Sequence, residues 1–351
     1  MKILVTGGCG FIGSWLVRRA LKAGHSVVNL DVLTYAANPD NLSDVCDNKN
    51  YEFIHGDICD GELVTELFTR TKPDAIIHLA AETHVDKSID SASDFIKTNV
   101  LGTQILLDAA TDYRNSLVGK RYDIFRFLHV STDEVYGDLG PTDPAFSETT
   151  PYAPSSPYAA SKASSDHLVR AWHRTHGLPI LITNCSNNYG PNQFPEKLIP
   201  LVILRALADQ EIPVYGTGEN VRDWLYVQDH ADAILTVLKD GCIGETYNVG
   251  GEEERTNLDL VKCLCAVLDD LRPRKQGSYV DLIKFISDRP GHDRRYAMNI
   301  KKISTELGWS PATDLQQGLE RTIKWYLDNT DWWQRILDRN AVTERQGLGA
   351  K

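Results

Sequence analysis

The chain has no apolar run long enough to cross a membrane and no excess of positive charge. A membrane-spanning helix needs about 18 or more consecutive apolar residues, and no such run is present. The N-terminal apolar run, Ile3–Val5, is cut short by glycines and is too brief for a signal peptide. A net charge of −11 disfavours nucleic acid and anionic membranes as partners, because both require a basic face. We therefore expect a cytoplasmic protein with a small-molecule ligand.

The chain also lacks paired cysteines and a complete set of metal ligands. Its seven Cys are scattered, odd in number and without a CxxC pair, which predicts reduced thiols rather than a disulfide framework. His173 and His176 lie three residues apart on a predicted helix. No third ligand is in register with them, so we expect no metal site.

Short apolar segments alternate with amphipathic ones through the first half of the chain. This order is typical of a parallel sheet covered by helices on both faces. The expected strands are Ile3–Val5, Ser26–Leu30, Glu52–Ile54, Ala75–Leu79, Phe125–Val130 and Pro179–Thr183. The expected helices are Trp15–Ala23, Gly61–Arg70, Ser91–Tyr113 and Tyr158–His176, followed in the second half by Leu258–Leu271 and Leu315–Leu327. Segments rich in Pro and Gly predict ligand-contacting loops at Tyr189–Pro200, Glu211–Asn220 and Arg289–His292.

The predicted fold class is α/β: a Rossmann-type doubly wound parallel sheet with a smaller mixed α/β C-terminal domain that binds substrate. We expect a nucleotide-binding domain over residues 1–183, to which segments near 221–248 return. A second domain is expected over 184–335 and a C-terminal tail over 336–351. Val342–Lys351 has no hydrophobic periodicity and is expected to be frayed.

A glycine-rich turn follows the first predicted strand and opens the first helix. Its residues are Gly7, Gly10, Phe11, Ile12 and Gly13. Glycines allow the backbone to approach a pyrophosphate, and the helix N-terminus offers free N–H groups. Asp31 ends the second strand about 20 residues further on, where a carboxylate accepts from a ribose 2′-OH and repels a 2′-phosphate. The pattern therefore indicates NAD rather than NADP, with Asp57, Ile58, Leu79, Ala80 and Ala81 following later strands as further cofactor contacts.

A second group of residues has the chemistry of an oxidation coupled to an elimination. Tyr158 and Lys162 are four residues apart and so share one face of a helix. The ammonium charge favours the phenolate, which can then abstract a hydroxyl proton, and Thr132 can share that hydrogen bond. Oxidation alone needs only these three groups. The adjacent acids Asp133 and Glu134 suggest that a second proton is removed and a leaving group is protonated.

The chain resembles the extended short-chain dehydrogenase/reductases, and among them most closely the dTDP-glucose 4,6-dehydratase family, from Lys2 to about Trp333. The resemblance rests on ordered motifs, including Ser131-Thr132-Asp133-Glu134-Val135-Tyr136-Gly137, Tyr158-Ala159-Ala160-Ser161-Lys162, Asn187-Asn188-Tyr189-Gly190-Pro191 and Asp288-Arg289-Pro290-Gly291-His292. Thr83 departs from the pattern, which has Ser at that position.

The resemblance implies a reaction and a homodimer. Tyr158, with Lys162 and Thr132, would deprotonate the sugar 4-hydroxyl while carbon 4 gives a hydride to NAD. Glu134 would then remove the carbon 5 proton, and Asp133 would protonate the departing carbon 6 hydroxyl. The resemblance adds Leu33, Thr34, Thr98 and Asn188 to the cofactor site. On the substrate side it implies Thr83, Asp133, Asn187, Lys197, Leu198, Pro213, Tyr215, Arg222, Asn257, Arg289, His292 and Tyr296.

Three alternatives stay open. A UDP- or CDP-glucose dehydratase differs only in the base that its pocket accepts. A UDP-sugar 4-epimerase also uses Tyr, Lys, Thr and NAD, but it has no need of Asp133 and Glu134. A non-catalytic NAD-binding scaffold is expected to have lost some of the reacting residues, whereas this chain has all of them.

Overall fold

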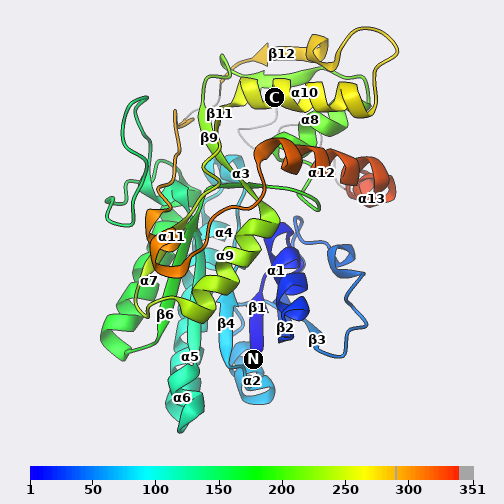
Figure 1. The fold of residues 1–351 in the computed structure, drawn as a ribbon. Helices are drawn as coiled ribbons and strands as arrows, with labels where there is room; N and C mark the ends of the chain where they lie inside the picture. The colour runs from blue at the N-terminus through cyan, green and yellow to red at the C-terminus, as the bar shows by residue number, and fades with distance from the viewer. Residues whose placement is uncertain (289–290, 340–351) are drawn as a thin grey trace.

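A seven-stranded parallel sheet forms the central layer of the molecule (Figure 1), which we describe from a computed structural model for residues 1–288 and 291–339. The strand order is β10-β6-β5-β4-β1-β2-β3. Every neighbouring pair is parallel, as expected when helical crossovers connect the strands. The strands are β1 Lys2–Thr6, β2 Ser26–Asp31, β3 Tyr51–His55, β4 Ala75–His78, β5 Arg126–Thr132, β6 Ile180–Cys185 and β10 Thr246–Val249.

Helices cover both faces of this sheet because successive strand residues point to opposite sides. Ile3 and Val5 belong to a buried cluster with α1 and α9, whereas Leu4 belongs to a cluster with α2, α5 and α7. The helices on the first face are α1 Phe11–Lys22, α9 Val227–Asp240 and α11 Lys301–Leu307. Those on the second are α2 Gly61–Thr71, α5 Thr103–Ser116 and α7 Pro157–His176.

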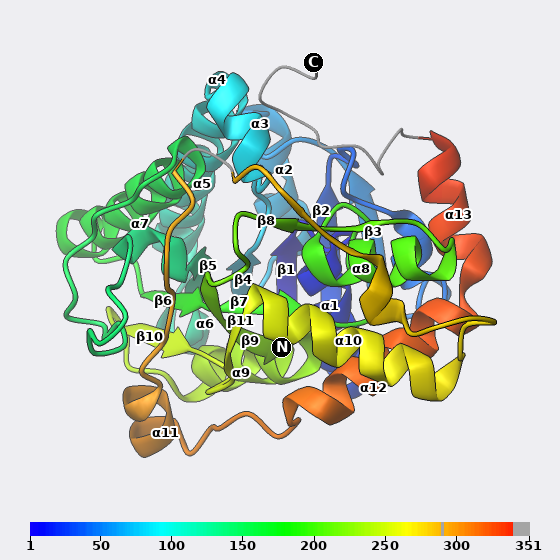
Figure 2. The same cartoon turned by 90° about the horizontal axis from the view of Figure 1, so that it is seen from above.

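A smaller unit lies beyond the carboxyl ends of the strands (Figures 1 and 2). Its two small sheets contain β7 Asn187–Tyr189, β9 Val221–Tyr226 and β11 Glu254–Thr256, and β8 Ile212–Tyr215 and β12 Ile283–Ile286. Its helices are α8 Leu198–Leu207, α10 Asn257–Leu271, α12 Leu315–Asp328 and α13 Thr330–Arg339. These elements bury a separate apolar core that includes Trp224, Leu264 and Ile323. Since β10 returns to the large sheet after β9, the chain crosses between the two units more than once.

Short elements complete the connections. They are η1 Pro39–Leu42, α3 Val85–Asp90, α4 Ser93–Phe95, η2 Ile96–Gly102, α6 Lys120–Ile124, η3 Asp133–Tyr136 and η4 Tyr279–Leu282. Within residues 1–288 and 291–339, no helix combines the length and apolarity that crossing a membrane requires.

The expected α/β fold class is confirmed, and three local expectations are wrong. The single helix expected over Ser91–Tyr113 begins only at Ser93, because Ser91 is extended and ends α3, and its middle is the π-helix η2. The loop expected over Glu211–Asn220 contains β8, which pairs with the distant β12. The loop expected over Tyr189–Pro200 contains the end of β7 and the start of α8. Val342–Lys351 lies outside the described residues.

Asp229 on α9 holds the segment that leads into α12. Its Oδ2 accepts from the backbone N–H groups of Ala312 at 3.2 Å and Thr313 at 2.9 Å. Replacing it by Ala would leave two donors without their carboxylate, so we expect a loss of about 1–3 kcal/mol in unfolding free energy. Urea denaturation followed by circular dichroism measures this loss. The matched control, Asp240→Ala on an exposed position of the same helix, should change the midpoint little; equal effects would show that Asp229 is not a structural anchor.

Candidate active site

The carboxyl edge of the parallel sheet gathers nearly all of the predicted cofactor and reacting residues. The glycine turn follows β1, Asp31 ends β2, Asp57 follows β3, and Leu79 follows β4. Thr132 ends β5 and leads directly into η3, which carries Asp133 and Glu134. β1 lies between β2 and β4. After β1 the chain continues to β2 and β3 on one side, and it then returns past β1 to β4 on the other side. Such a switch point opens the crevice in which α/β sheets bind their ligands.

Two glycines of the turn sit where a side chain has no room. Gly7 has a φ of 75°, and a Cβ there would lie 2.8 Å from the backbone of Ala80. A Cβ on Gly13 would lie 2.2 Å from the carbonyl oxygen of Gly7. The turn therefore packs tightly against β4 and against itself, which leaves the N-terminus of α1 close to the surface. Gly10, Phe11 and Ile12 are half-buried there, and first-turn N–H groups have no acceptor within their own helix. This geometry fits a pyrophosphate.

Asp31 is buried and organises the loop that follows β2. Its two oxygens accept from the backbone N–H groups of Cys9 and Leu33, each at 2.9 Å. Leu33 has a φ of 56°, so the carboxylate helps to hold a backbone conformation that Leu rarely adopts. Burial raises the pKa of Asp31, and the two backbone donors oppose that rise. Thr34 beside it is exposed, whereas Ile58 is buried against Gly102.

The start of α7 fixes the position of Tyr158. Ser156 caps the helix by accepting from the backbone N–H of Ala159 at 3.1 Å, and Pro157 occupies the first turn. Tyr158 and Lys162 follow on one face, and both are buried. Burial and the Glu134 carboxylate raise the pKa of Tyr158, and its hydrogen bond with Thr132 acts in the opposite direction. Without a bound cation, the phenol is therefore a poor base.

Asp133 and Glu134 are adjacent but lie in different environments. Asp133 is 2 % exposed, and Thr132 donates to its Oδ1 at 3.2 Å. Burial and then the Glu134 charge raise the pKa of Asp133 well above its ordinary value. Glu134 is only half-buried. Burial thus favours the protonated form of Asp133, whereas Glu134 keeps contact with solvent; a general acid beside a general base requires such a difference between two carboxyl groups.

The smaller unit supplies most of the predicted substrate residues. Arg222 on β9 is buried, and its guanidinium carbon lies 4.3 Å from the ring centre of Tyr296. Burial and then the Glu134 charge raise the pKa of Tyr296. Burial raises the pKa of Asp133, and the Arg222 charge opposes that rise. Arg222 and Tyr296 therefore lie close to the acid pair. Tyr215 on β8 meets His292 edge to face, with ring centres 6.4 Å apart.

Three polar side-chain atoms near these residues are buried and have no hydrogen-bond partner in the described part of the chain. They are Oδ2 of Asp133, Oδ1 of Asn187 and Oδ1 of Asn257. Buried polar atoms are normally satisfied, so their number here is consistent with a polar ligand. Asn188 instead points back into the protein, where its Oδ1 lies 2.9 Å from Nδ1 of His230.

The remaining predicted residues are scattered around this group. Lys197 is the residue before α8, and its Nζ lies 4.0 Å from Glu196. Leu198 opens α8, Pro213 is on β8, and Thr83 is exposed on the loop after β4. Thr98 lies within η2, and Ala81 is half-buried after β4. Arg289 lies outside the described residues.

Sequence analysis missed Asn99, which links the loop after β4 to α7. Its Oδ1 accepts from the backbone N–H of Glu82 at 2.9 Å, and its Nδ2 donates to the carbonyl of Glu82 and to Ser161 Oγ. A polar residue in the middle of a predicted helix was the available signal, because a buried amide needs several partners. His129 and Asp166, which lie behind Lys162, were also missed.

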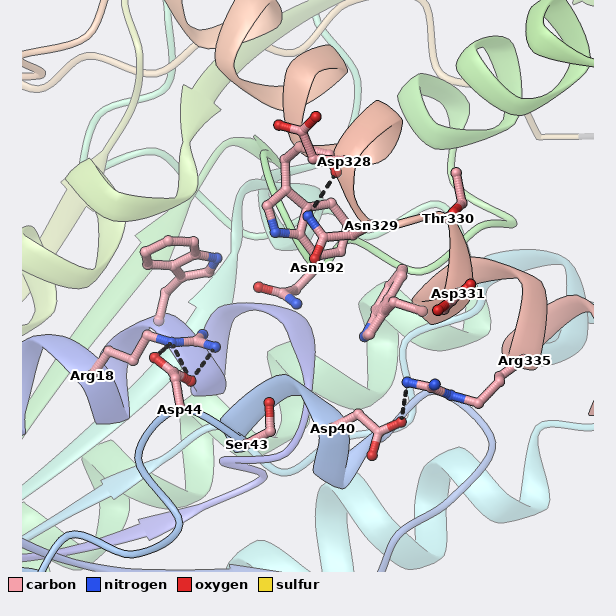
Figure 3. Close-up of a pocket in the computed structure, with 13 residues that line it drawn as sticks. Arg18, Asp40, Ser43, Asp44, Asn192, Asp328, Asn329, Thr330, Asp331 and Arg335 are labelled. Atoms are coloured by element: carbon pink, nitrogen blue, oxygen red, sulfur yellow. Dashed lines mark hydrogen bonds and ion pairs between the residues drawn. The ribbon is translucent and has the colours of Figure 1, made fainter.

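A cavity lies away from these residues, between α1 and the α12–α13 turn (Figure 3). Its volume is about 730 Å³. Both arginines that line the cavity form ion pairs with carboxylates, Arg18 with Asp44 at 2.8 Å and Arg335 with Asp40 at 2.9 Å. Among the described residues there is no cluster of three or more metal-ligating side chains, in this cavity or elsewhere.

A Rossmann-type sheet with Tyr158 and Lys162 one helical turn apart at its carboxyl edge defines the class of the molecule, an extended short-chain dehydrogenase/reductase. Comparison with known proteins makes the assignment more specific. The family model described as GDP-mannose 4,6 dehydratase matches residues 4–322. A dTDP-glucose 4,6-dehydratase of Neisseria meningitidis is 55 % identical and covers 99 % of each chain. One of Xanthomonas campestris is 57 % identical over 98 % of each chain.

Solved structures agree with this result. A dTDP-glucose 4,6-dehydratase of Bacillus anthracis in complex with NAD superposes with a TM-score of 0.85, at 42 % identity, over 96 % of this chain and 99 % of the other. That of Streptomyces venezuelae, with NAD and a second ligand bound, gives 0.87 at 44 % identity, over 96 % of this chain and 100 % of the other. The chain therefore belongs to the nucleotide-sugar 4,6-dehydratase family.

The raised pKa of buried Asp133 predicts how the stability of the protein depends on pH. The folded-state pKa of Asp133 is raised above its unfolded value, so folding is favoured at low pH and is weakened as pH rises through the folded pKa. Replacing Asp133 by Asn removes this penalty. We expect the melting temperature of Asp133→Asn to exceed that of the unchanged protein by about 2 °C or more at pH 8, and the gap to narrow toward pH 4. Differential scanning fluorimetry across this range measures it; a gap that is independent of pH would contradict the assignment, and exposed Asp240→Asn is the control.

Proposed function

We propose that this protein is a dTDP-glucose 4,6-dehydratase, which converts dTDP-glucose to dTDP-4-keto-6-deoxyglucose and water. The observation that carries the proposal is the acid pair: Asp133, whose pKa is raised by burial, stands beside half-buried Glu134 and next to Tyr158. An oxidoreductase or an epimerase needs no such pair. The high identity of the relatives named dTDP-glucose 4,6-dehydratase supports the same substrate.

Tyr158 begins the reaction by accepting the proton of the sugar 4-hydroxyl. NAD held at the carboxyl edge of the sheet would supply the hydride carrier for the oxidation at carbon 4 and for the later reduction at carbon 6. In the protein alone, burial and Glu134 keep the Tyr158 phenol protonated. Lys162 and the positive charge of the oxidised nicotinamide ring would together favour the phenolate. Thr132, which hydrogen-bonds Tyr158, would orient the same hydroxyl.

The acid pair then acts on the neighbouring carbons. The new ketone acidifies carbon 5, and the ionised Glu134 accepts that proton. The protonated Asp133 gives its proton to the carbon 6 hydroxyl, which leaves as water. After carbon 6 has been reduced, carbon 5 is reprotonated. The product differs from the substrate by one water, and the cofactor ends the cycle in its initial state.

The proposed cofactor site uses residues at the carboxyl edge of the sheet. The turn from Gly7 to Gly13 would hold the pyrophosphate, and Asp31 would accept from the adenosine ribose. Both of its oxygens already accept one backbone N–H, but each carboxylate oxygen has capacity for a further donor. The other proposed contacts are Leu33, Thr34, Asp57, Ile58, Leu79, Ala80, Ala81, Thr98, Tyr158, Lys162 and Asn188.

The proposed substrate site uses the smaller unit. Arg222 would meet the diphosphate, for which a planar guanidinium is well suited, and Tyr215 would pack on the base. Asn187 and Asn257 would direct their free amide oxygens to the substrate. The other proposed contacts are Thr83, Asp133, Lys197, Leu198, Pro213, Arg289, His292 and Tyr296.

The domain division and the assembly are parts of the same proposal. Residues 1–183 would form the NAD-binding domain and 184–335 the nucleotide-sugar domain. The return to the large sheet spans α9 and β10, so it starts later than the predicted 221, which is the first residue of β9 in the smaller unit. We propose a cytoplasmic homodimer formed through α5 and α7. Ile96 and Leu101 in the helical segment preceding α5 are exposed at 57 % and 46 %, which a partner subunit would cover.

The proposal is tested by incubating the purified protein with dTDP-glucose in heavy water and following the nucleotide sugar by mass spectrometry. We expect loss of one water, gain of one solvent deuteron at carbon 5 and no net NADH. Asp133→Asn and Glu134→Gln should slow elimination by about 100-fold or more, because each removes a proton-transfer group. They should slow oxidation less, so transient NADH should accumulate. If the protein converts only UDP-glucose or only CDP-glucose, the substrate carries a different nucleotide base from the one proposed. If the product is the 4-epimer, the protein is an epimerase.

The glycine turn gives an independent test of cofactor binding. Gly13→Ala would place a methyl group 2.2 Å from a backbone oxygen, so the turn must shift away from its present geometry. We expect the NAD dissociation constant to rise about tenfold or more, measured by calorimetry on protein stripped of cofactor. Gly61→Ala is the matched control, since its methyl group would make an ordinary 3.8 Å contact. Equal affinities in the two variants would exclude the turn as the pyrophosphate site.

A further inference from the structure

Three ionisable side chains from β5 and from α7, the helix that carries Tyr158, meet in the buried interior of the molecule. Lys162 is 4 % exposed, and His129 and Asp166 are both completely buried. Nζ of Lys162 donates to the carbonyl of Val130 at 2.9 Å and lies 3.4 Å from Nε2 of His129. The same Nε2 lies 3.2 Å from Oδ1 of Asp166. We call Lys162, His129 and Asp166 the buried triad.

Asp166 is held in the ionised form. Its Oδ2 accepts from Tyr152 OH at 2.7 Å, Ser131 Oγ at 2.9 Å and Asn184 Nδ2 at 3.3 Å. Burial alone would raise the pKa of Asp166, but His129, Lys162 and Tyr152 outweigh burial and lower it. A carboxylate kept charged in the core needs a cation, and Lys162 is the cation of the triad.

Lys162 and Asp166 are four residues apart on α7, a spacing at which a lysine and a carboxylate usually meet directly. The ion pairs of the described residues include no contact between them, because the imidazole of His129 lies between the two charges. A direct pair would draw the ammonium group toward Asp166 and along the helix, away from Tyr158. His129 therefore separates the two charges without removing their attraction.

The imidazole is neutral. Burial and the Lys162 charge lower the pKa of His129 to about 4. Within the described residues, Nδ1 of His129 and Oδ1 of Asp166 have no hydrogen-bond partner. Oδ1 lies 3.2 Å from Nε2, but the hydrogen bond of Nε2 is with Nζ of Lys162 at 3.4 Å. A neutral imidazole carries no charge that balances Asp166, so Lys162 has to supply that charge.

We propose that Asp166, on the far side of the neutral imidazole of His129, is the counter-ion that keeps Lys162 charged on the helical face that it shares with Tyr158. Asp166 and His129 are thus positioning residues for the oxidation step, and this inference rests on the proposed function. They touch neither the substrate nor the cofactor. Their role is to let a lysine stay an ammonium in a site from which water is excluded.

Other titratable groups around the triad do not replace Asp166 in this role. Cys185 on β6 is a buried thiol whose pKa is raised by burial, so it is neutral. His78 on β4 is neutral because burial lowers its pKa. Arg170 on α7 is a cation; it donates to Tyr152 OH at 2.7 Å and so acts on the far side of Asp166. Tyr136 and Tyr152 have pKa values raised by burial.

The test is Asp166→Asn in the full-length protein with dTDP-glucose as substrate. Loss of the carboxylate lowers the pKa of Lys162 further, which weakens the support for the Tyr158 phenolate. We expect the acid limb of the kcat profile to move up by about one pH unit and kcat at pH 7 to fall about tenfold. With substrate deuterated at carbon 4, the primary isotope effect on kcat should increase, because oxidation becomes slower than elimination.

Asp229→Asn is the matched control, since it neutralises a buried carboxylate on α9, outside the triad. A structural loss alone would lower kcat in both variants and leave the pH profile and the isotope effect unchanged. That result for Asp166→Asn would overturn the proposal.

A measurement on the unchanged protein covers the case in which Asp166→Asn does not fold. Nitrogen-15 NMR of histidine-labelled protein should show His129 as a neutral imidazole from pH 6 to 9. An imidazolium in this range would sink the proposal, because His129 itself would then be the counter-ion of Asp166. Because this measurement needs no substrate, it stays decisive even if the protein fails to convert dTDP-glucose and the proposed function is wrong.

Discussion

A lysine ammonium in the dry interior is the constraint on which much of the surrounding structure depends. Lys162 lies under the carboxyl end of β5, where the carbonyl of Val130 accepts one of its protons. An isolated charge at such a depth would be lost by deprotonation, since desolvation costs several kcal/mol. The helix that carries this charge, α7, is held by polar side chains that are themselves hydrogen-bonded, such as Asn99, Ser161 and Ser165. These partners link the catalytic helix to the π-helix η2 and to the loop after β4.

The low polarity of the interior acts unequally on the two adjacent acids, Asp133 and Glu134. In water, Asp133 and Glu134 would both be ionised at neutral pH. At the end of β5, the tight turn of η3 directs one side chain into the protein and leaves the other half-exposed. Burial and the neighbouring charge act in the same direction on Asp133. A short turn after a buried strand is therefore sufficient to place two neighbouring carboxyl groups in different environments.

The strands β1 to β6, most helices and the residues proposed to react were predictable from the sequence, because each follows from a local pattern. Tyr158 and Lys162 share a helical face, and the glycine turn follows a strand. The residues that support them were not predictable in this way. His129 reads as one more residue of an apolar strand, and Asp166 as a polar position on an amphipathic helix. Their meeting depends on the register of β5 against α7, which is a long-range property of the packing. The pairing of β8 with β12 was missed for the same reason.

The proposed acid pair is confined to a short segment between the strands and helices of the large sheet. An elimination needs two proton carriers besides the groups that oxidise carbon 4. The two residues proposed for this task, Asp133 and Glu134, both lie in η3, which directly follows β5. Since they occupy a four-residue turn, a few substitutions there could change the proposed reaction and leave the strands and helices of the large sheet intact.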